Sequence, residues 1–182
     1  RRVGLMVDFD GTISEIAPTP EDAIVSPEAA ESLKALAARL ELVSVISGRP
    51  ARNVRDKVGV EGLIYVGVHG AEYLDGTSLS YAPGLSKHRK DLEAVYDHLR
   101  SAVDMPGLVL EDKQFAVAVR YRMAGDPAQA RKMLADVLAS APGAEKLDIL
   151  WGKMVVEVRP ASGIDKGYAV RRLARERRLE SA

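Results

Sequence analysis

The sequence predicts an α/β fold in which a parallel sheet covered by helices is interrupted by a smaller α+β unit. Short apolar runs alternate with helix-like segments in the first part of the chain, and this order is typical of parallel sheets. The pattern changes near residue 76, and a helix late in the chain is expected to return to the first domain. We therefore predict a discontinuous core, residues 1–79 and 161–182, and an inserted unit, residues 80–160.

Three short apolar runs predict the buried strands of the core. They are VGLMV at residues 3–7, LVSVIS at 42–47 and LIYVGV at 63–68. None alternates regularly between polar and apolar side chains, which is typical of strands that are covered on both faces. Helices are expected between them, over residues 27–40, where Ser26 is suited to cap the helix, and over a shorter stretch before the third strand.

A different pattern begins after the third strand. The stretch GTSLSYAPG is rich in turn-forming residues and is interpreted as a linker. The order that follows is helix, strand, strand, helix, strand, strand, and AVAVRYR alternates strictly enough for one face of its sheet to be solvated. These elements are expected at residues 85–103, 108–122 with a turn near Asp112, 126–140, and 144–160 with a turn at Gly152. A last helix should begin near Asp165.

The composition excludes several classes of protein and site. Lys and Arg together number 26, as do Asp and Glu, and the resulting net charge of zero argues against a nucleic-acid partner. Cysteine is absent, which excludes disulfides, thiolate metal sites and cysteine nucleophiles. No apolar run approaches the roughly 20 residues of a membrane span, and the first one is too short for a signal peptide. We expect a cytoplasmic protein without a membrane partner, present as a monomer or a weak oligomer.

Asp8 and Asp10 form the sharpest chemical signal. Residues two apart on a strand project to the same face, so both carboxylates leave the carboxyl end of the first buried strand together. Open parallel sheets bind their ligands at that end. Gly11 and Thr12 then allow a tight turn that can offer N–H groups to an anion. Because adjacent carboxylates repel, a cation should accompany them, and Mg²⁺ is the natural partner of oxygen ligands.

The motif DFDGTIS after a hydrophobic strand resembles the first motif of the haloacid-dehalogenase-like phosphohydrolases. Within that superfamily the chain resembles the trehalose-6-phosphate phosphatases. The motifs that carry the narrower resemblance are DFDGTISEIAPTPEDA, VSVISGRP, YVGVHGAEY, the Glu-x-Lys at Glu111 and Lys113, RYR at 120–122, and GKMVVEVRP followed by DKG. The resemblance implies a Rossmann-like core of the haloacid-dehalogenase type with an inserted α+β cap domain of order αββαββ.

The resemblance also implies catalytic roles. Asp8 would attack phosphorus as a nucleophile and form an aspartyl-phosphate. Asp10 would protonate the leaving sugar oxygen and later take a proton from water. Mg²⁺ would be held by the Asp8 side chain and the Asp10 carbonyl. Ser47 would donate a hydrogen bond to a phosphoryl oxygen, unless it serves only as a helix N-cap, and Lys166 would balance the charge around nucleophile and phosphate.

In the inserted unit, the resemblance implies that Glu111, Lys113 and Glu157 bind the sugar hydroxyls. Carboxylates and ammonium groups suit this task because they make charge-assisted hydrogen bonds to a hydroxyl-rich ligand. The alternative is that these residues are charges at the edges of strands in a hairpin.

Four further residues have weaker assignments. Arg49 and Arg122 could supplement phosphate or sugar binding, or could be ordinary surface arginines. His69 and Glu72 belong to the family pattern just past the third strand, but no chemical step is assigned to either, and His69 could equally be a structural histidine.

One element of the family is absent from the sequence. The fourth motif, a Gly-Asp-Asp strand end that supplies a further carboxylate to Mg²⁺, has no counterpart, and the chain therefore looks truncated. With only Asp8 and Asp10 at the site, we expect weaker magnesium binding and an impaired enzyme.

Rival functions stay open at this stage. The leading hypothesis is a phosphatase of trehalose 6-phosphate, and the second is a phosphatase of sucrose 6-phosphate or mannosyl-3-phosphoglycerate. Both share a small-molecule sugar phosphate as the partner. A non-catalytic sugar-phosphate-binding module would explain the missing motif, but it has no need of a nucleophile at Asp8. A phosphomutase ranks last, because it should need a different cap.

Overall fold

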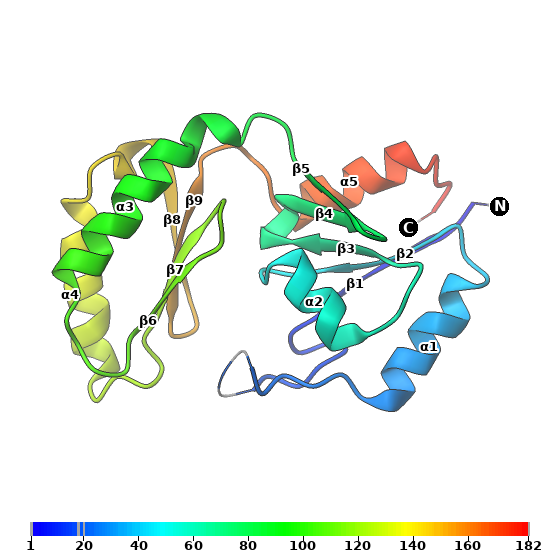
Figure 1. Ribbon diagram of the computed structural model, residues 1–182, viewed down its shortest axis with the longest axis horizontal. Coiled ribbons are helices and arrows are strands. Elements are labelled where there is room, and N and C mark those ends of the chain that lie inside the picture. The colour runs from blue at the N-terminus through cyan, green and yellow to red at the C-terminus, as the bar shows by residue number, and fades with distance from the viewer. Residues whose placement is uncertain (1, 18, 20, 182) are drawn as a thin grey trace. The chain divides into compact units, whose positions relative to one another are not determined.

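The chain forms two units, each with its own sheet and its own buried apolar cluster (Figure 1). The computed structural model describes residues 2–17, 19 and 21–181. The first unit comprises the chain up to Ala82 and from Ile164 onward, and the second comprises Pro83–Gly163.

The first unit contains a mixed sheet in the order β1-β2-β3-β4-β5. Its strands are β1 Gly4–Asp8, β2 Leu42–Ile46, β3 Ile64–Gly67, β4 Glu72–Asp75 and β5 Ser78–Tyr81. The pairs β1–β2 and β2–β3 are parallel, as the alternation of strands and helices predicts. The pairs β3–β4 and β4–β5 are antiparallel and extend the sheet on one side. In the register of β1 and β2, Asp8 lies opposite Ile46, so the residues that follow both strands emerge at the same edge.

The interpretation of GTSLSYAPG as a linker is wrong. Its first two residues, Gly76 and Thr77, form the turn of a hairpin, and the next four residues form β5. Gly76 has a φ of 56°, which glycine adopts without strain. Asp75-Gly76 is a strong hairpin signal, but the strand that follows is short and mostly polar. Such a strand at the edge of a sheet gives little apolar periodicity, which explains the wrong interpretation.

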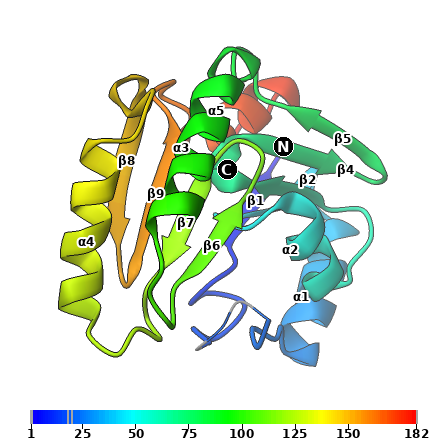
Figure 2. The same cartoon turned by 60° about the vertical axis from the view of Figure 1, so that its left-hand side comes forward.

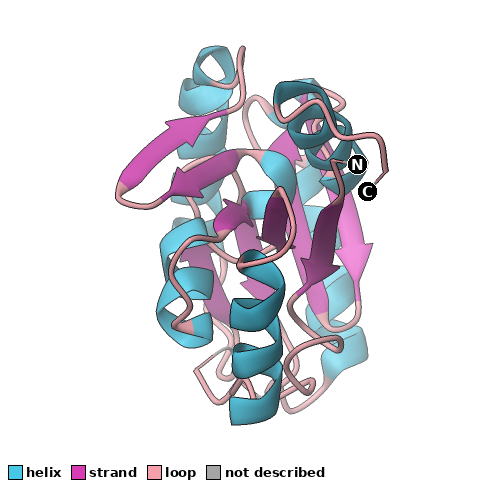
Figure 3. Ribbon diagram, turned by 90° about the vertical axis from the view of Figure 1, so that its right-hand side faces the viewer, coloured by secondary structure: helices cyan, strands magenta, loops and turns pink. Residues whose placement is uncertain are grey.

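Three helices cover the first sheet. They are α1 Pro27–Ala37, α2 Ala51–Val58 and α5 Lys166–Glu176. Ser26 caps α1 as predicted, since its Oγ accepts from the N–H of Ala29 at 3.2 Å, although α1 ends three residues earlier than expected. α1 and α2 share one apolar cluster with Val43 and Val45 of β2. Tyr73 points to the opposite face, where the guanidinium of Arg172 from α5 lies 4.0 Å from its ring, so helices lie on both sides of the sheet (Figure 3).

The second unit has the predicted order of helix, strand, strand, helix, strand, strand. The elements are α3 Arg89–Ala102, β6 Val109–Asp112, β7 Val117–Arg120, α4 Pro127–Ala139, β8 Leu147–Gly152 and β9 Val155–Pro160. All pairs of the sheet β6-β7-β9-β8 are antiparallel (Figure 2). Asp126 caps α4 as expected from the sequence, accepting from the N–H groups of Ala128 and Gln129. No helix among the described residues is long and apolar enough to cross a membrane.

The two faces of the second sheet differ in chemistry. α3 and α4 pack together on one face over a cluster that includes Val119, Val156 and Leu134. Alternate residues of the strands point to the other face, where Glu111, Ala118 and Glu157 lie side by side in the register of three strands. The strict alternation of AVAVRYR therefore produces one apolar face and one charged face, as the sequence indicates.

Candidate active site

The first carboxylate of the motif, Asp8, pairs with a lysine from a distant part of the chain. Asp8 is the last residue of β1, and its Oδ1 lies 2.7 Å from Nζ of Lys166, the first residue of α5. The same oxygen accepts from the N–H of Phe9 at 2.8 Å. Asp165 caps α5 by accepting from the N–H of Tyr168 at 2.6 Å, and this fixes the helix start that carries Lys166.

The second carboxylate, Asp10, is bound by an arginine. Nη2 of Arg49 lies 2.7 Å from Oδ1 of Asp10, and its Nε lies 3.0 Å from Oδ2, so the guanidinium and the carboxylate form a two-pronged pair. Arg49 is only 8% exposed, and its guanidinium also lies 5.0 Å from the centre of the buried Phe9 ring. Arg49 is therefore not an ordinary surface arginine, because the residue is nearly buried and its guanidinium is held between Asp10 and Phe9.

Ser47 lies in the turn that follows β2 and carries Arg49. It is fully buried, its N–H donates to the carbonyl of Val66 at 2.9 Å, and its Oγ accepts from the N–H of Arg49 at 3.1 Å. The residue at the N-cap of α2 is Pro50, so Ser47 is not the N-cap of that helix. Its hydroxyl instead shapes the turn and lies at the edge of the sheet where Asp8 emerges.

The buried residue Glu72 stands at the start of β4. Its Oε2 accepts from the N–H of Ala51, the first residue of α2, at 2.7 Å, and burial raises the pKa of its carboxyl group above the ordinary value. His69 lies in the turn before β4 and adopts a left-handed backbone conformation with φ 55°. Both residues contact the segment around Arg49, a role for which the sequence alone gives no signal beyond the family pattern.

The charged face of the second sheet brings together the three residues expected to bind sugar. Nζ of Lys113 lies 2.8 Å from Oε1 of Glu157 and 3.9 Å from Oε2 of Glu111. Lys113 and Glu157 are nearly buried, at 8% and 9% exposure. Ala118 lies between the two glutamates in the register, and its small side chain leaves room for the lysine to reach both.

The structure adds one residue to this cluster and leaves one out. Nε of Arg120 lies 2.6 Å from Oε1 of Glu111, a contact set by strand register that the sequence analysis missed. The alternation that places residues 118 and 120 on one face could have indicated it. Arg122 lies beyond the end of β7, is exposed, and has no contact with the cluster among those described.

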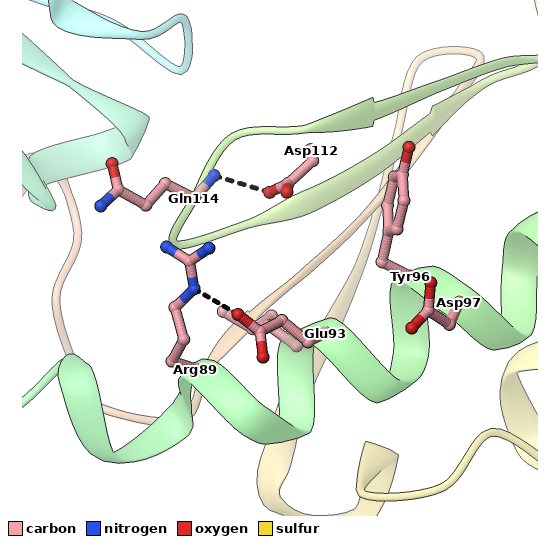
Figure 4. Close-up of a pocket in the computed structure, with 7 residues that line it drawn as sticks. Arg89, Glu93, Tyr96, Asp97, Asp112 and Gln114 are labelled. Atoms are coloured by element: carbon pink, nitrogen blue, oxygen red, sulfur yellow. Dashed lines mark hydrogen bonds and ion pairs between the residues drawn. The ribbon is translucent and has the colours of Figure 1, made fainter.

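A small pocket lies elsewhere in the second unit, between α3 and the β6–β7 hairpin (Figure 4). Arg89 and Glu93 of α3 form an ion pair on one side, and Asp112 accepts from the N–H of Gln114 on the other. Its volume is about 60 Å³, and none of the residues expected to bind the sugar lines it.

The donors at the end of β1 fit a hard divalent cation. Asp8 offers a partly exposed carboxylate, and Asp10 follows two residues later with a backbone carbonyl. Oxygen donors of this kind suit Mg²⁺, which keeps several water ligands. Among the residues that the structure describes, no group of three or more acidic or histidine side chains could hold a metal ion. The Asp8 carboxylate and the Asp10 carbonyl would supply only part of a magnesium shell, and other ligands would have to complete it.

The mixed sheet, with parallel strands β1, β2 and β3 and two carboxylates at the end of β1, has the fold of the haloacid-dehalogenase-like hydrolases. A solved structure of this class, from Bacteroides thetaiotaomicron, matches 98% of this chain and 78% of its own with a TM-score of 0.69 and 13% identity, a likeness of fold. The particular family is narrower. The trehalose-phosphatase family model matches residues 6–181, and the chain belongs to this family.

Individual relatives agree with this membership. The chain is 36% identical over 179 residues to a trehalose-phosphate phosphatase of Mycobacterium bovis, and 40% identical over 174 residues to an uncharacterized glycosyl hydrolase of Mycobacterium tuberculosis. The solved C-terminal domain of the C. albicans trehalose-6-phosphate phosphatase matches 95% of this chain and 61% of its own, with a TM-score of 0.74 and 25% identity. The alignments cover 92% and 93% of this chain but only 42% and 13% of the two curated relatives.

Proposed function

We propose that the chain acts as a magnesium-dependent phosphatase that hydrolyses trehalose 6-phosphate to trehalose and phosphate. The observation that carries the proposal is that each carboxylate of the first motif has its own cation, Lys166 for Asp8 and Arg49 for Asp10. Two carboxylates held apart in this way can take different roles, one as nucleophile and one as acid and base. Membership of the trehalose-phosphatase family supports trehalose as the sugar.

In the first step, a carboxylate oxygen of Asp8 forms a bond to phosphorus while the bond between phosphorus and the sugar oxygen breaks. Lys166 favours this step, because its ammonium group lies beside the Asp8 carboxylate and offsets the charge of the incoming phosphate. Asp10, in its protonated form and released from its ion pair with Arg49, gives its proton to the departing sugar oxygen. The products are the free sugar and an aspartyl-phosphate on Asp8.

In the second step, water attacks phosphorus and Asp8 leaves as a carboxylate. Asp10, ionised by the first step, takes a proton from this water, and Arg49 holds the carboxylate in position through its two-pronged contact. The Ser47 hydroxyl stabilises a phosphoryl oxygen in both steps. Bound Mg²⁺, on Asp8 and the Asp10 carbonyl, would supply positive charge that lowers the repulsion between nucleophile and phosphate.

The charged face of the second sheet supports a sugar substrate. Glu111 and Glu157 can accept hydrogen bonds from sugar hydroxyls, and Lys113 can donate to a sugar oxygen. Because Lys113 already contacts both carboxylates, the three side chains form one preorganised group. We propose that this group selects the sugar, while the residues of the first unit carry out the hydrolysis.

The test is phosphate release from trehalose 6-phosphate, glucose 6-phosphate and sucrose 6-phosphate, each with Mg²⁺ and with EDTA. We expect release from trehalose 6-phosphate that EDTA abolishes. A preference for sucrose 6-phosphate would support the second candidate and overturn the choice of trehalose. Binding of trehalose 6-phosphate without release from any of the three, in a folded protein with Mg²⁺, would overturn the phosphatase function and favour a sugar-phosphate-binding module.

A further inference from the structure

The turn between β3 and β4 is strained and runs beside the turn that carries Arg49. Val68 and His69 have φ values of 47° and 55°, which residues with a side chain rarely adopt, and which are costly for a β-branched residue such as Val68. Strain of this kind persists only where the surroundings hold it in place. Here the start of α5 packs against the turn, and several main-chain hydrogen bonds join it to the segment that carries Arg49.

Three main-chain hydrogen bonds join the two turns. The N–H of Ser47 donates to the carbonyl of Val66, the N–H of Val68 to that of Arg49, and the N–H of His69 to that of Ser47, each at 2.9 Å. The backbone of Ser47 and Arg49 therefore follows the backbone of the strained turn. A displacement of the turn between β3 and β4 would therefore also displace the turn that follows β2.

Glu72 completes this connection with a side chain. Its buried carboxylate accepts the N–H of Ala51 at 2.7 Å. The N-cap of α2 is Pro50, which has no acceptor in its side chain, and the first turn of α2 contains no acidic residue. Glu72 thus supplies from another strand the acceptor that a helix start requires, as well as a negative charge near the positive end of the helix.

Gly67 makes this arrangement sterically possible. A Cβ at this position would collide with the backbone of Ala51 and would lie 2.8 Å from Oε2 of Glu72. Only a glycine lets the carboxylate and the helix start meet across β3. The need for glycine at position 67 indicates that the contact between Glu72 and the start of α2 is part of the packing of this unit.

We propose that Glu72 is a positioning residue that fixes Arg49 and Ser47 for phosphoryl transfer by holding the first N–H of α2. Arg49 precedes Ala51 by two residues, and the φ angle of the intervening Pro50 is restricted. Because few backbone angles can change between them, the anchored N–H of Ala51 limits where the Arg49 guanidinium can lie relative to Asp10. The catalytic consequence of this inference rests on the proposed phosphatase function, whereas the anchoring itself does not.

Two substitutions separate anchoring from general stability. Glu72→Gln keeps an oxygen that can accept from Ala51, while Glu72→Ala removes it. Glu61→Ala is the matched control, since Glu61 is exposed and follows the other end of α2. Where E72A does not fold, Glu72→Asp serves in its place, because its shorter side chain does not span the same distance. Thermal melting curves identify a temperature at which all variants are folded, and both readouts below are measured at that temperature.

The first readout is amide hydrogen exchange at Arg49 and Ala51, which is independent of catalysis. We expect about tenfold faster exchange in E72A, and less than about threefold in E72Q and E61A, because only E72A loses the anchor. Equal exchange in E72A and E61A would overturn the proposal. If the wild-type protein released no phosphate, the proposed function would fail, while this measurement would still decide the anchoring.

The second readout is the kinetics of phosphate release from trehalose 6-phosphate. We expect kcat of E72A to fall about tenfold or more while KM changes less than about threefold, because the displaced groups act on Asp10 and on the phosphoryl group and not on the sugar hydroxyls. E72Q should recover most of kcat. An E72A enzyme that melts earlier but keeps its kcat would show a purely structural role and contradict the proposal, as would an E72Q enzyme no better than E72A.

Discussion

The carboxyl edge of the first sheet and the charged face of the second sheet both concentrate ionised side chains, but they arrange them differently. At the first sheet each carboxylate has a separate cation, and the Asp8 and Lys166 side chains are each about 40% exposed. At the second sheet one lysine contacts two carboxylates and is almost buried. The pair of Asp8 and Lys166 is therefore partly open to solvent, whereas the group around Lys113 is largely closed to it.

The difference in burial predicts that the ion pairs of the two regions contribute differently to the free energy of unfolding. Partly exposed ion pairs contribute about 0–1 kcal/mol to stability, because solvent screens them. Removing one partner of a nearly buried pair costs about 3–5 kcal/mol, since it leaves a charge without compensation. Substitutions at the edge of the first sheet should therefore lower activity more than stability. Substitutions on the charged face of the second sheet should lower stability.

The largest expected effect is on activity, at the first sheet. Asp8→Asn should lower phosphate release from trehalose 6-phosphate by at least about 10³-fold, because the neutral amide cannot form the aspartyl-phosphate. The melting temperature should stay close to that of the wild type. Asp136→Asn, at an exposed position of α4, is the control and should keep full activity. Substantial activity in D8N would mean that another group attacks phosphorus.

The next effect is on stability, at the second sheet. Lys113→Met should lower the free energy of unfolding by about 3 kcal/mol, because Glu157 would keep a buried charge without its partner. Denaturant unfolding measures this difference. The double variant K113M/E157L should recover part of the loss, since it removes both charges. If K113M unfolds like the wild type, the pair is more hydrated than its burial indicates.

A matched substitution at the first sheet sharpens the contrast. Lys166→Met should change the free energy of unfolding by less than about 1 kcal/mol, because its pair with Asp8 is solvated. It should nevertheless lower kcat about 10²-fold, since the charge beside the nucleophile is lost. Unfolding curves and initial rates on the same samples test both parts. A K166M variant as unstable as K113M would show that exposure does not distinguish the two regions.

The smallest expected effect is a pH dependence from Glu72. Because burial raises its folded-state pKa above the ordinary 4.5, the folded protein binds this proton more tightly than the unfolded chain. The stability of the wild type relative to E72Q should therefore be greatest below pH 4.5 and should decline as pH rises through the raised pKa. Unfolding of both proteins across this pH range measures the difference. A constant difference would show that Glu72 has an ordinary pKa.

The sequence was most informative where function depends on residues close together in the chain. Asp8 and Asp10 follow one apolar strand, and the register of β1 and β2 brings Ser47 to the same edge. The contact of Arg120 with Glu111 depends on how β6 pairs with β7, and the contact of Glu72 with α2 depends on a glycine in the strand between them. No local pattern encodes these contacts, because they arise from the packing of separate elements. β5 was missed for a related reason, since a short polar edge strand has little apolar signal.

The position of α5 in the chain has a consequence for the order of synthesis. Pro83–Gly163 is continuous, so the second unit can fold as soon as the ribosome has released it. The first unit is discontinuous, and Lys166 is made only after the whole second unit, whereas its partner Asp8 is made before that unit. The pair of Asp8 and Lys166 is therefore completed only once the second unit has been synthesised. A nascent chain that has not yet reached α5 carries Asp8 without the lysine that pairs with it, so the proposed hydrolysis reaches its full rate only after translation has passed that helix.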